Sequence, residues 1–459
     1  MRLLSRKAMA LALVAGIAVS TSAVATNGYF LIGYGAKSRS MGGTGVANGQ
    51  DGLAAAANPA AMVDVGTRAD MGVEYFRPKR GFVHDSATLE SGFPGAETGV
   101  NHRSGSNNFL IPSAGAVYQF NDRMTFGMAV IGNGANTRFN QQVPGIDSCL
   151  DGNTSDGVGS TAYNFNCLGS KTVGVSLLQM QMLPSIAYRV TSNHTLGASL
   201  AIGIQQFRAY GLQSFLELGF SAGTKNLTNN GNDYSYGAGA RVGYQGKFFN
   251  NMLTLGANYA TKVYMSKFDK YEDLFAQEGR FDIPAHWTVG FAIKPHKKWT
   301  IAGDVQRIYY GDVKSVANLG PQASNPNSFF PPGTDVTGKH NGLGFGWNDQ
   351  NVYKIGVNFD YSKKLSFRAG YNYGESQFDS DQVLFNFLAP AVNQHHLTLG
   401  ASYRHGKHHE FSASYMHAFK NTVKGPTVFG PESGLPVHGS NASIDMRINA
   451  FGVSYGYKF

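Results

Sequence analysis

The chain has 459 residues, of which 12% are aromatic, 58 are glycine and only 15% are charged. Soluble domains carry about 25% charged residues, so this composition suits an exported β-rich protein or an outer-membrane β-barrel, in which strand alternation averages the hydropathy out. The formal charge is +9, but the basic residues are scattered with no run of four, which argues against nucleic-acid binding.

Residues 1–25 have the features of an export signal. Three basic residues precede a short apolar stretch, Ala8–Val19, and Ala23-Val24-Ala25 forms a small-residue cleavage site. This order is typical of a secretory signal peptide. The apolar stretch is shorter than the roughly 20 residues that a membrane-spanning helix needs, and no longer apolar run follows it. The sequence therefore argues against a helical membrane protein and predicts an exported chain.

The segment 26–66 is rich in glycine and alanine. It does not match a nucleotide-binding loop, because Ala36 precedes Lys37 where the Walker pattern needs glycine, and Asn48 replaces the third glycine of a dinucleotide motif. It also lacks strand alternation and is too apolar for a disordered tail. We therefore expect an ordered plug inside a barrel, in which glycines permit tight turns and Asn58-Pro59-Ala60 ends an alanine-rich run.

Apolar and polar residues alternate from residue 67 onward. In YKIGVNFDY, Tyr353–Tyr361, the aromatic and aliphatic side chains fall on one face, and Lys354 and Asp360 fall on the other. Strict alternation predicts half-buried strands rather than helices. An apolar outer face and a polar inner face are typical of a membrane barrel, whereas a soluble sandwich alternates with its apolar face inside.

The lengths of the connections distinguish these two folds. We expect fourteen strands, at residues 67–80, 109–120, 124–139, 173–191, 193–211, 233–247, 251–268, 280–295, 299–313, 350–361, 364–378, 394–405, 409–421 and 444–459. Short turns follow the even-numbered strands and long connections follow the odd-numbered ones, as in outer-membrane barrels. The sequence therefore predicts an all-β fold, a 14-stranded antiparallel transmembrane β-barrel over residues 67–459 with a plug in its lumen.

The third expected strand, Met124–Phe139, contains an interruption of the alternation at Gly132, Asn133 and Gly134. Glycine and asparagine tolerate backbone conformations that other residues avoid, so a bulge or an inward kink is expected there. An ordinary glycine-rich barrel strand is the alternative.

Two predicted loops carry further features. Cys149 and Cys167 lie close together in a polar segment, and such a pair in an exported protein predicts a disulfide. The stretch QSFLELGFS is too apolar for a solvated loop because of four residues, Phe215, Leu216, Leu218 and Phe220. These residues form either a ligand groove, because ligand sites are mostly apolar, or a contact with a neighbouring loop.

We find no sequence feature that predicts a catalytic or metal site. His395-His396 and His408-His409 are adjacent pairs, and adjacent residues of a strand point to opposite faces, so each pair would chelate a metal poorly. The chain has neither a nucleophile elbow nor a metalloprotease spacing. We therefore expect a protein that is not an enzyme and that needs no cofactor, metal or nucleic acid.

The N-terminal segment and the C-terminus carry a family resemblance. Gly28-Tyr29-Phe30, Ser40-Met41-Gly42-Gly43 and Asn58-Pro59-Ala60 precede the first strand in this order, and alternating aromatics lead to Phe459. This arrangement resembles the FadL/TodX family of outer-membrane transporters of long-chain fatty acids and other hydrophobic compounds. The resemblance extends over the hatch, the fourteen strands, the long outer loops and the terminal phenylalanine.

The resemblance implies passive transport by a multi-pass monomer in the outer membrane of a Gram-negative bacterium. Outer loops would capture a hydrophobic ligand, foremost a long-chain fatty acid, which would bind above the hatch. The ligand would then leave sideways into membrane lipid at the kink, Gly132–Gly134. Lys262 and Arg280 face the lumen by alternation and are candidate partners for the carboxylate.

Three other functions stay open. A channel for aromatic or alkane hydrocarbons would not require a basic residue in the pathway. An outer-membrane hydrolase would require serine, histidine and an acid that converge near one rim. An open porin would conduct ions freely.

Overall fold

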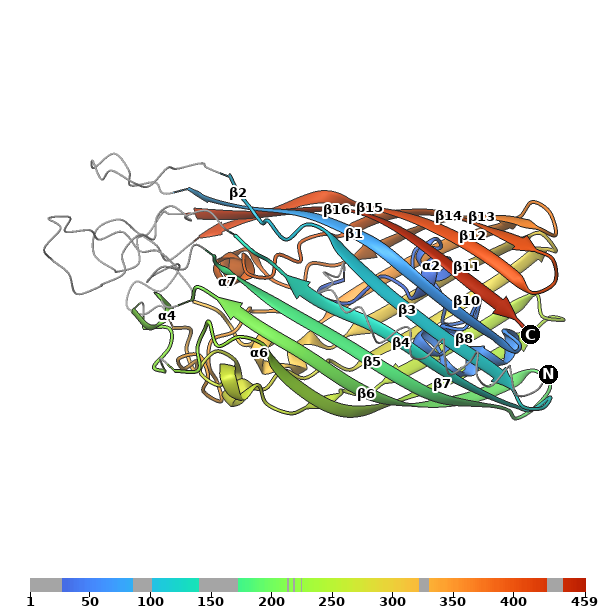
Figure 1. Cartoon of the computed structure of the whole chain (residues 1–459), viewed down its shortest axis with the longest axis horizontal. Helices are drawn as coiled ribbons and strands as arrows, with labels where there is room; N and C mark the ends of the chain where they lie inside the picture. Colours follow the sequence, from blue (N-terminus) through green and yellow to red (C-terminus); the bar gives the residue numbers. More distant parts are fainter. Residues whose placement is uncertain are drawn as a thin grey trace, which may run out of the picture.

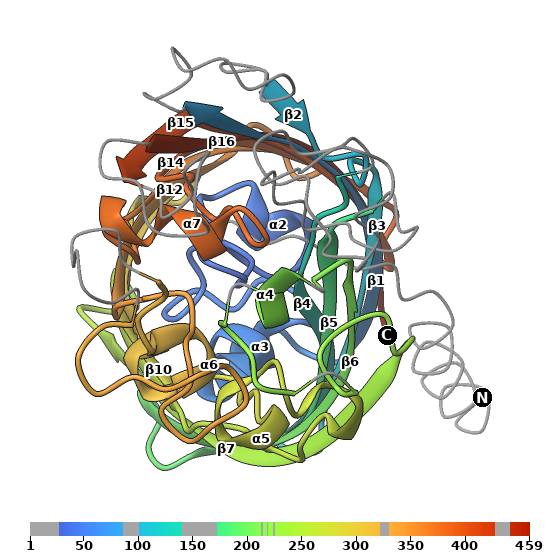
Figure 2. The ribbon, with the colours of Figure 1, turned by 90° about the vertical axis from the view of Figure 1, so that its left-hand side faces the viewer.

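The computed structural model describes residues 27–85, 101–139, 172–212, 214–217, 219–223, 225–321, 330–426 and 441–459. Within these ranges, antiparallel strands form one closed sheet (Figures 1 and 2). Of the sixteen strands, two are short pieces that pair beside longer ones, which leaves fourteen in the wall. The predicted fourteen-stranded barrel is therefore confirmed.

The wall strands are β1 (Arg68–Asp85), β3 (Phe109–Gln119), β4 (Met124–Asn136), β5 (Gly174–Arg189), β6 (His194–Tyr210), β7 (Asp233–Phe248), β8 (Leu253–Ala260), β10 (His286–His296), β11 (Trp299–Ile308), β12 (Gln350–Asp360), β13 (Leu365–Gly374), β14 (His395–His405), β15 (His409–Pro426) and β16 (Asn441–Lys458). The short strands are β2 (Asn101–Arg103), which pairs with β1, and β9 (Tyr264–Met265), which pairs with β7. β16 closes the ring by pairing along the whole of β1.

Side chains alternate between the lumen and the outer face, as the sequence predicts. On β12, Tyr353 and Ile355 are 43% and 50% exposed on the outer face, whereas Gln350 and Val352 are buried on the inner face. Lipid surrounds a transmembrane barrel, so exposed aromatic and aliphatic side chains are stable on this outer face.

The two ends of the barrel differ. Short turns lie at the end that holds the C-terminus, and longer connections with short helices lie at the opposite end (Figure 1). In outer-membrane barrels the short turns face the periplasm, so the long connections mark the outer end. These connections contain α4 (Ser214–Glu217), η4 (Asp269–Tyr271), α5 (Ala276–Gly279), η5 (Tyr310–Asp312), α6 (Lys314–Ala317), η6 (Ser380–Gln382) and α7 (Val383–Asn386). In the described ranges, no helix has both the length and the apolar composition to cross a membrane.

Residues 27–66 lie inside the barrel, as the blue ribbon in Figure 2 shows. This N-terminal segment contains α2 (Gly35–Arg39), α3 (Ala54–Ala57) and η1 (Pro59–Asp64). η1 packs against β5, β6 and β7, and α2 packs against β14, β15, β16 and β1. The segment therefore reaches across the lumen between opposite sides of the wall.

Glycines on the inner face allow the N-terminal segment to approach the wall closely. A Cβ atom on Gly370 of β13 would lie 2.1 Å from the backbone nitrogen of Gly42, and one on Gly197 of β6 would lie 2.4 Å from that of Ala60. Both distances are too short for non-bonded atoms, so only glycine fits at these positions. Gly42 itself has φ of +68°, a conformation that glycine adopts without strain.

Asn58 links the N-terminal segment to itself and to the wall. Its Oδ1 accepts a hydrogen bond from the Ala60 backbone N–H at 3.0 Å, which caps η1. Its Nδ2 donates to the carbonyl oxygens of Val46, at 2.7 Å, and Tyr244 of β7, at 2.9 Å. Asn58 has no exposed surface, so its side chain cannot bond to water in the folded protein. The three hydrogen bonds take the place of those bonds to water.

Buried ion pairs attach α2 to the opposite side of the wall. Lys37 Nζ lies 2.7 Å from a carboxylate oxygen of Glu410 on β15, and Arg39 pairs with Glu74 on β1. Arg68 bridges Glu410, at 3.2 Å, and Asp70, at 2.5 Å. Removal of one partner from a buried pair leaves an uncompensated charge, so these contacts fix the position of α2.

Candidate functional site

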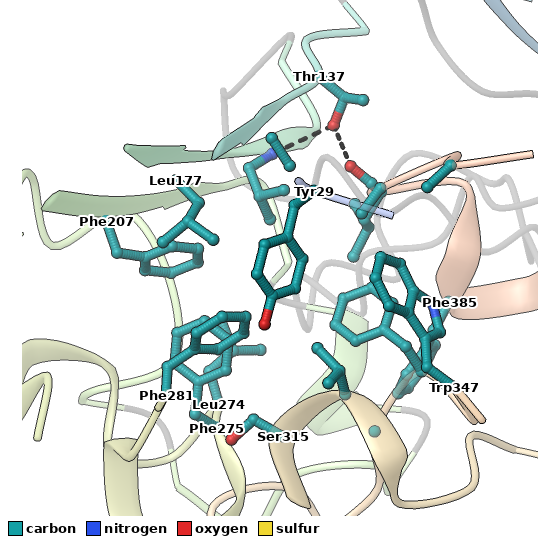
Figure 3. Close-up of a pocket in the computed structure, with 18 of the residues that line it drawn as sticks. Tyr29, Thr137, Leu177, Phe207, Leu274, Phe275, Phe281, Ser315, Trp347 and Phe385 are labelled. Carbon is teal, nitrogen blue, oxygen red and sulfur yellow. Dashed lines mark hydrogen bonds between the residues drawn. The ribbon is translucent and has the colours of Figure 1, made fainter. Parts of the chain in front are cut away.

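A cavity inside the barrel lies between the N-terminal segment and the outer connections (Figure 3). The space between protein atoms there is about 870 Å³, part of which is open to solvent. The lining comes from the N-terminal segment, from β1, β4, β5 and β6, and from the connections that follow β6, β9, β11 and β13. The large side chains of the lining are Tyr29, Arg80, Phe207, Phe215, Leu274, Phe275, Phe281, Phe345, Trp347 and Phe385.

Aromatic contacts between separate connections build the cavity walls. Phe215 of α4 stacks on Phe385 of α7, with ring centroids 4.8 Å apart and planes at 11°. Phe207 of β6 meets Phe275 edge to face at 4.5 Å. Tyr29 stacks on Trp347 at 5.7 Å, and Figure 3 shows its ring projecting between these groups. Offset and edge-to-face ring pairs are the favoured geometries, so the walls are both apolar and well packed.

Arg80 is the one charged side chain in the described lining of this cavity. It is 1% exposed, and its two terminal nitrogens donate to the backbone carbonyls of Asn136 and Ser106. Its Nε has no hydrogen-bond partner among the described residues, and none of the ion pairs there involves it. A buried guanidinium without a carboxylate partner is unfavourable, so an anionic group in the cavity would be stabilised beside it.

The barrel wall has a break between β3 and β4. These strands pair only from Gln119↔Thr125 to Ala114↔Val130. Beyond Val130, the residues Ile131–Asn136 pair with β5 alone, and Phe109–Ser113 pair with β1 alone. In Figure 2, β4 lies nearer the N-terminal segment than β3 does. An unpaired backbone is unfavourable next to lipid, so this break is a specific feature of the wall.

The break coincides with Gly132, Asn133 and Gly134, but its cause is not a bulge. β4 keeps one unshifted register with β5 from Met124↔Tyr188 to Asn136↔Ser176, so of the two expected geometries, a bulge or an inward kink, the bulge is not present. The strand instead bends away from β3 as a whole. It ends at Asn136 rather than at Phe139, which forms only an isolated bridge with Val173.

A second cavity of about 410 Å³ lies at the break. β3 contributes Ile111, Pro112 and Ser113 to its lining, and β4 contributes Ile131 and Gly132. The inner side is the N-terminal segment from Leu31 to Arg39, together with the Arg39–Glu74 ion pair. Proline in a strand is favoured at an edge, where a missing N–H leaves no partner unsatisfied, which suits Pro112 at this position.

Residues 29–31 separate the two cavities. Tyr29 lines the first cavity and Leu31 lines the second. The Tyr29 carbonyl accepts a hydrogen bond from Gly134 N–H at 3.4 Å, and Leu31 N–H donates to Asn133 Oδ1 at 3.5 Å. Both distances are at the long end of the hydrogen-bond range, so these two bonds are weak.

Two of the four predicted groove residues, Phe215 and Phe220, lie at the first cavity or directly behind it. Phe215 lines the cavity, and Phe220 is buried behind it against Phe215 and Phe385. Leu216, by contrast, is 36% exposed. Leu218 lies outside the described residues.

Neither predicted carboxylate partner lines either of the two cavities described above. Lys262 follows the end of β8 and donates through Nζ to the Asp312 carbonyl at 2.7 Å. Arg280 precedes β10, and its Nε lies 3.3 Å from a carboxylate oxygen of Asp282. The inward orientation expected from alternation does not apply, because the strand ends at Ala260 and parity does not extend through irregular chain. Their role as carboxylate partners stays a prediction.

Cys149 and Cys167 lie in the part of the chain that the structure does not describe, so the predicted disulfide stays a prediction. The same holds for the signal peptide, residues 1–25.

Sequence reasoning missed several residues of the first cavity. Arg80 could have been found from the sequence, because it is a charged residue that shares the inner face of β1 with Phe76, Pro78 and Phe82. Trp347 and Phe385 carried none, since they lie in irregular connections that only the fold brings to Tyr29 and Phe215.

The N-terminal segment also contains buried ionisable side chains. Burial, followed by the neighbouring Asp70 carboxylate, raises the pKa of Asp51 to about 6. Burial, followed by the nearby Arg68 guanidinium, lowers the pKa of Lys37 from its ordinary value. Asp51 Oδ1 accepts a hydrogen bond from the Leu53 N–H at 3.0 Å, so this carboxyl stabilises the turn that precedes α3.

Several solved structures have a similar fold. The toluene transporter TodX of Pseudomonas putida is 20% identical, with a TM-score of 0.62, over 94% of this chain and 99% of that one. A FadL homologue of Pseudomonas aeruginosa is 16% identical, with a TM-score of 0.65, over 94% and 100%. The toluene transporter TbuX of Ralstonia pickettii is 19% identical, with a TM-score of 0.53, over 93% and 99%. A sequence search of curated proteins gives no match.

The closed barrel, its lipid-facing outer side and its internal cavities define a multi-pass transport protein of the Gram-negative outer membrane. The family model described as "Outer membrane protein transport protein (OMPP1/FadL/TodX)" matches residues 152–459. The chain belongs to this family, as its N-terminal and C-terminal motifs predict.

Proposed function

We propose that the protein is a passive channel for hydrophobic molecules that carry one anionic group, foremost long-chain fatty acids. The single observation that carries the proposal is the buried Arg80 in an otherwise apolar cavity. An acyl chain suits the aromatic and aliphatic lining. A carboxylate suits a guanidinium that has no acidic partner, because charge-assisted hydrogen bonds are the strong ones.

The proposed pathway uses both cavities. The outer connections capture the ligand, the first cavity binds it above the N-terminal segment, and this segment acts as the plug. Displacement of residues 29–31 then opens the second cavity, and the ligand leaves through the break between β3 and β4 into the membrane. The driving force is partition into lipid, at about 0.8 kcal/mol for each buried CH₂ group, so no nucleotide is required.

A second candidate ligand is a monoaromatic hydrocarbon. Two observations favour it: the aromatic rings that line the first cavity, Phe215, Phe385 and Trp347 among them, and the structural likeness to transporters named for toluene. Such a ligand would pack among the rings and would make no use of Arg80.

Arg80→Gln and Arg80→Lys distinguish the two candidates. Trp347 lines the cavity, so a brominated stearate that binds there quenches its fluorescence, and a brominated stearyl alcohol serves as the uncharged probe. Loss of a charge-assisted hydrogen bond costs about 1.5–3 kcal/mol, so Arg80→Gln should lower the affinity for the brominated stearate by roughly 10-fold to 100-fold. Arg80→Lys should retain most of the affinity, and the alcohol should bind equally to all three proteins.

Equal binding of the acid to Arg80→Gln and wild type, with toluene competing for the same site, would favour the hydrocarbon candidate. A matched loss of the acid and the alcohol would show that the substitution distorts the cavity through Asn136 and Ser106, and Arg80→Lys separates this case because it keeps the charge.

A further inference from the structure

A row of three cations crosses the lipid-facing side of the barrel on β1, β16 and β15, which lie side by side (Figure 1). Lys79 of β1 and Arg447 of β16 stand directly opposite each other in the strand register. On the other side of Arg447, the pairing of β15 with β16 shifts between Ala418 and Asn421, and this bulge contains Lys420. A β-bulge re-aims the side chains of its strand, so Lys420 joins the row.

Further cations surround this row. Arg77 lies one outward position below Lys79, and Arg103 of β2 pairs opposite Gly81. Asp445 is the one acidic side chain described on this part of the surface, 2.8 Å from Arg103 and 3.8 Å from Lys420. Among the described residues, no ion pair involves Arg77, Lys79 or Arg447.

This arrangement is unfavourable unless an anion is present. Like charges directly opposite in neighbouring strands destabilise a sheet. Lys79 and Arg447 are two such like charges, and no acidic side chain lies between them. A cation elsewhere on the outer rim does have an acidic partner. Arg307 of β11 lies 3.0 Å from the Asp349 carboxylate and 3.1 Å from Asn351 Oδ1.

The height of the row places it at the outer edge of the membrane. Below it, towards the periplasmic end, the outward side chains of these strands are apolar or aromatic, among them Val73, Tyr75, Tyr415, Phe451 and Val453. A tilted barrel strand crosses the hydrocarbon in roughly 9–11 residues. Counted from the periplasmic end at Arg68, the cations begin at Arg77 and so lie where the outer-leaflet headgroups begin.

We propose that Lys79, Arg447 and Lys420 form a binding site for the phosphate groups of a phosphorylated glycolipid of the outer leaflet, the lipid A part of lipopolysaccharide. Acyl chains would lie along the apolar side chains below the row, and a phosphate would bridge the opposed cations. Arginine binds phosphate through parallel hydrogen bonds, and lysine binds it as a point charge. The three cations face away from the lumen and line neither cavity, whereas Val73 and Val453 below them also line the second cavity.

The test uses the full-length protein purified in mild detergent and measures binding of diphosphoryl lipid A by native mass spectrometry. The triple variant Lys79→Gln/Lys420→Gln/Arg447→Gln is compared with wild type, and Arg307→Gln is the matched control. At about 1 kcal/mol for each cation near an anionic lipid, affinity should fall by about 100-fold in the triple variant. It should not change in the control, and heat-modifiable migration verifies that each barrel is folded.

Dephosphorylated lipid A and phosphatidylglycerol are the comparison probes. The proposal requires that wild type prefers diphosphoryl lipid A to both. Equal binding of the dephosphorylated lipid, equal binding of phosphatidylglycerol, or retention of wild-type affinity by the triple variant would each overturn it.

Discussion

Asn58 is expected to decide whether the N-terminal segment stays docked in the lumen. Asn58→Ala removes the bond to Ala60 N–H and both bonds to the carbonyls of Val46 and Tyr244. Asn58, Val46 and Ala60 are buried, so water does not replace the bonds among them, whereas the bond to the Tyr244 carbonyl is only partly buried. The substitution leaves the strands themselves unchanged, and we therefore expect the barrel to assemble normally.

The magnitude follows from the three bonds. At about 1 kcal/mol for each hydrogen bond, the docked state loses about 3 kcal/mol. Since 1.4 kcal/mol is a factor of ten in an equilibrium constant, the undocked population rises by about 100-fold. The exposed Asn121 provides a matched control, because its Oδ1 also accepts two backbone bonds, from Arg123 N–H and Met124 N–H, but in a periplasmic turn.

Two measurements test this prediction. Planar bilayers should record more frequent open events for Asn58→Ala than for wild type or Asn121→Ala, and deletion of residues 28–62 should set the upper limit of conductance. Hydrogen exchange should accelerate in η1, Pro59–Asp64. If a correctly folded Asn58→Ala barrel showed wild-type conductance and wild-type exchange, the proposed plug role of the segment and the assignment of Asn58 as its anchor would both be refuted.

Three further predictions concern the same pathway. The raised pKa of Asp51 means that between about pH 4 and 6 the folded protein holds a proton that an unfolded segment has lost. Stability of the segment should therefore fall as pH rises through this window, by at most about 3 kcal/mol. Asp51→Asn should flatten the pH profile of exchange in Ala54–Ala57, and an unchanged slope would contradict the assignment. Gly132→Phe should fill the second cavity and abolish ligand uptake, while ligand binding in the first cavity persists. Gly132→Ala should behave as wild type, because its Cβ atom would have its nearest neighbour at 3.7 Å. Full uptake by Gly132→Phe would exclude exit of the ligand at the break. Phe215→Ala should weaken binding of the brominated stearate by roughly tenfold, since it removes a stacked ring from the lining, and a similar loss in the exposed Leu216→Ala would point to a loop-wide effect instead.

Much of the barrel was predictable because its signals are local. Alternation along Tyr353–Tyr361 marks a strand whichever strands flank it, and the alternation of short and long connections indicates a barrel. Gly132–Gly134 lie in the part of β4 that no longer pairs with β3, and β4 keeps an unshifted register with β5 there.

The site was less predictable because its contacts join distant parts of the chain. Phe215 was found from the unusual apolarity of its loop, but its partner Phe385 lies in another connection with no signal of its own. Lys262 was assigned an inward orientation by extending alternation past Ala260, where the strand ends and parity no longer holds.

The sequence by itself determined the fold class, the strand number and the family, because period-two patterning, loop lengths and short motifs all act within neighbouring residues. Only the tertiary structure decided which side chains meet. Closure of the ring places Lys79 opposite Arg447, and the bend of β4 opens the wall beside the N-terminal segment. Closure of the barrel and the packing of its loops depend on contacts between residues far apart in the chain, and no local pattern predicts which residues meet.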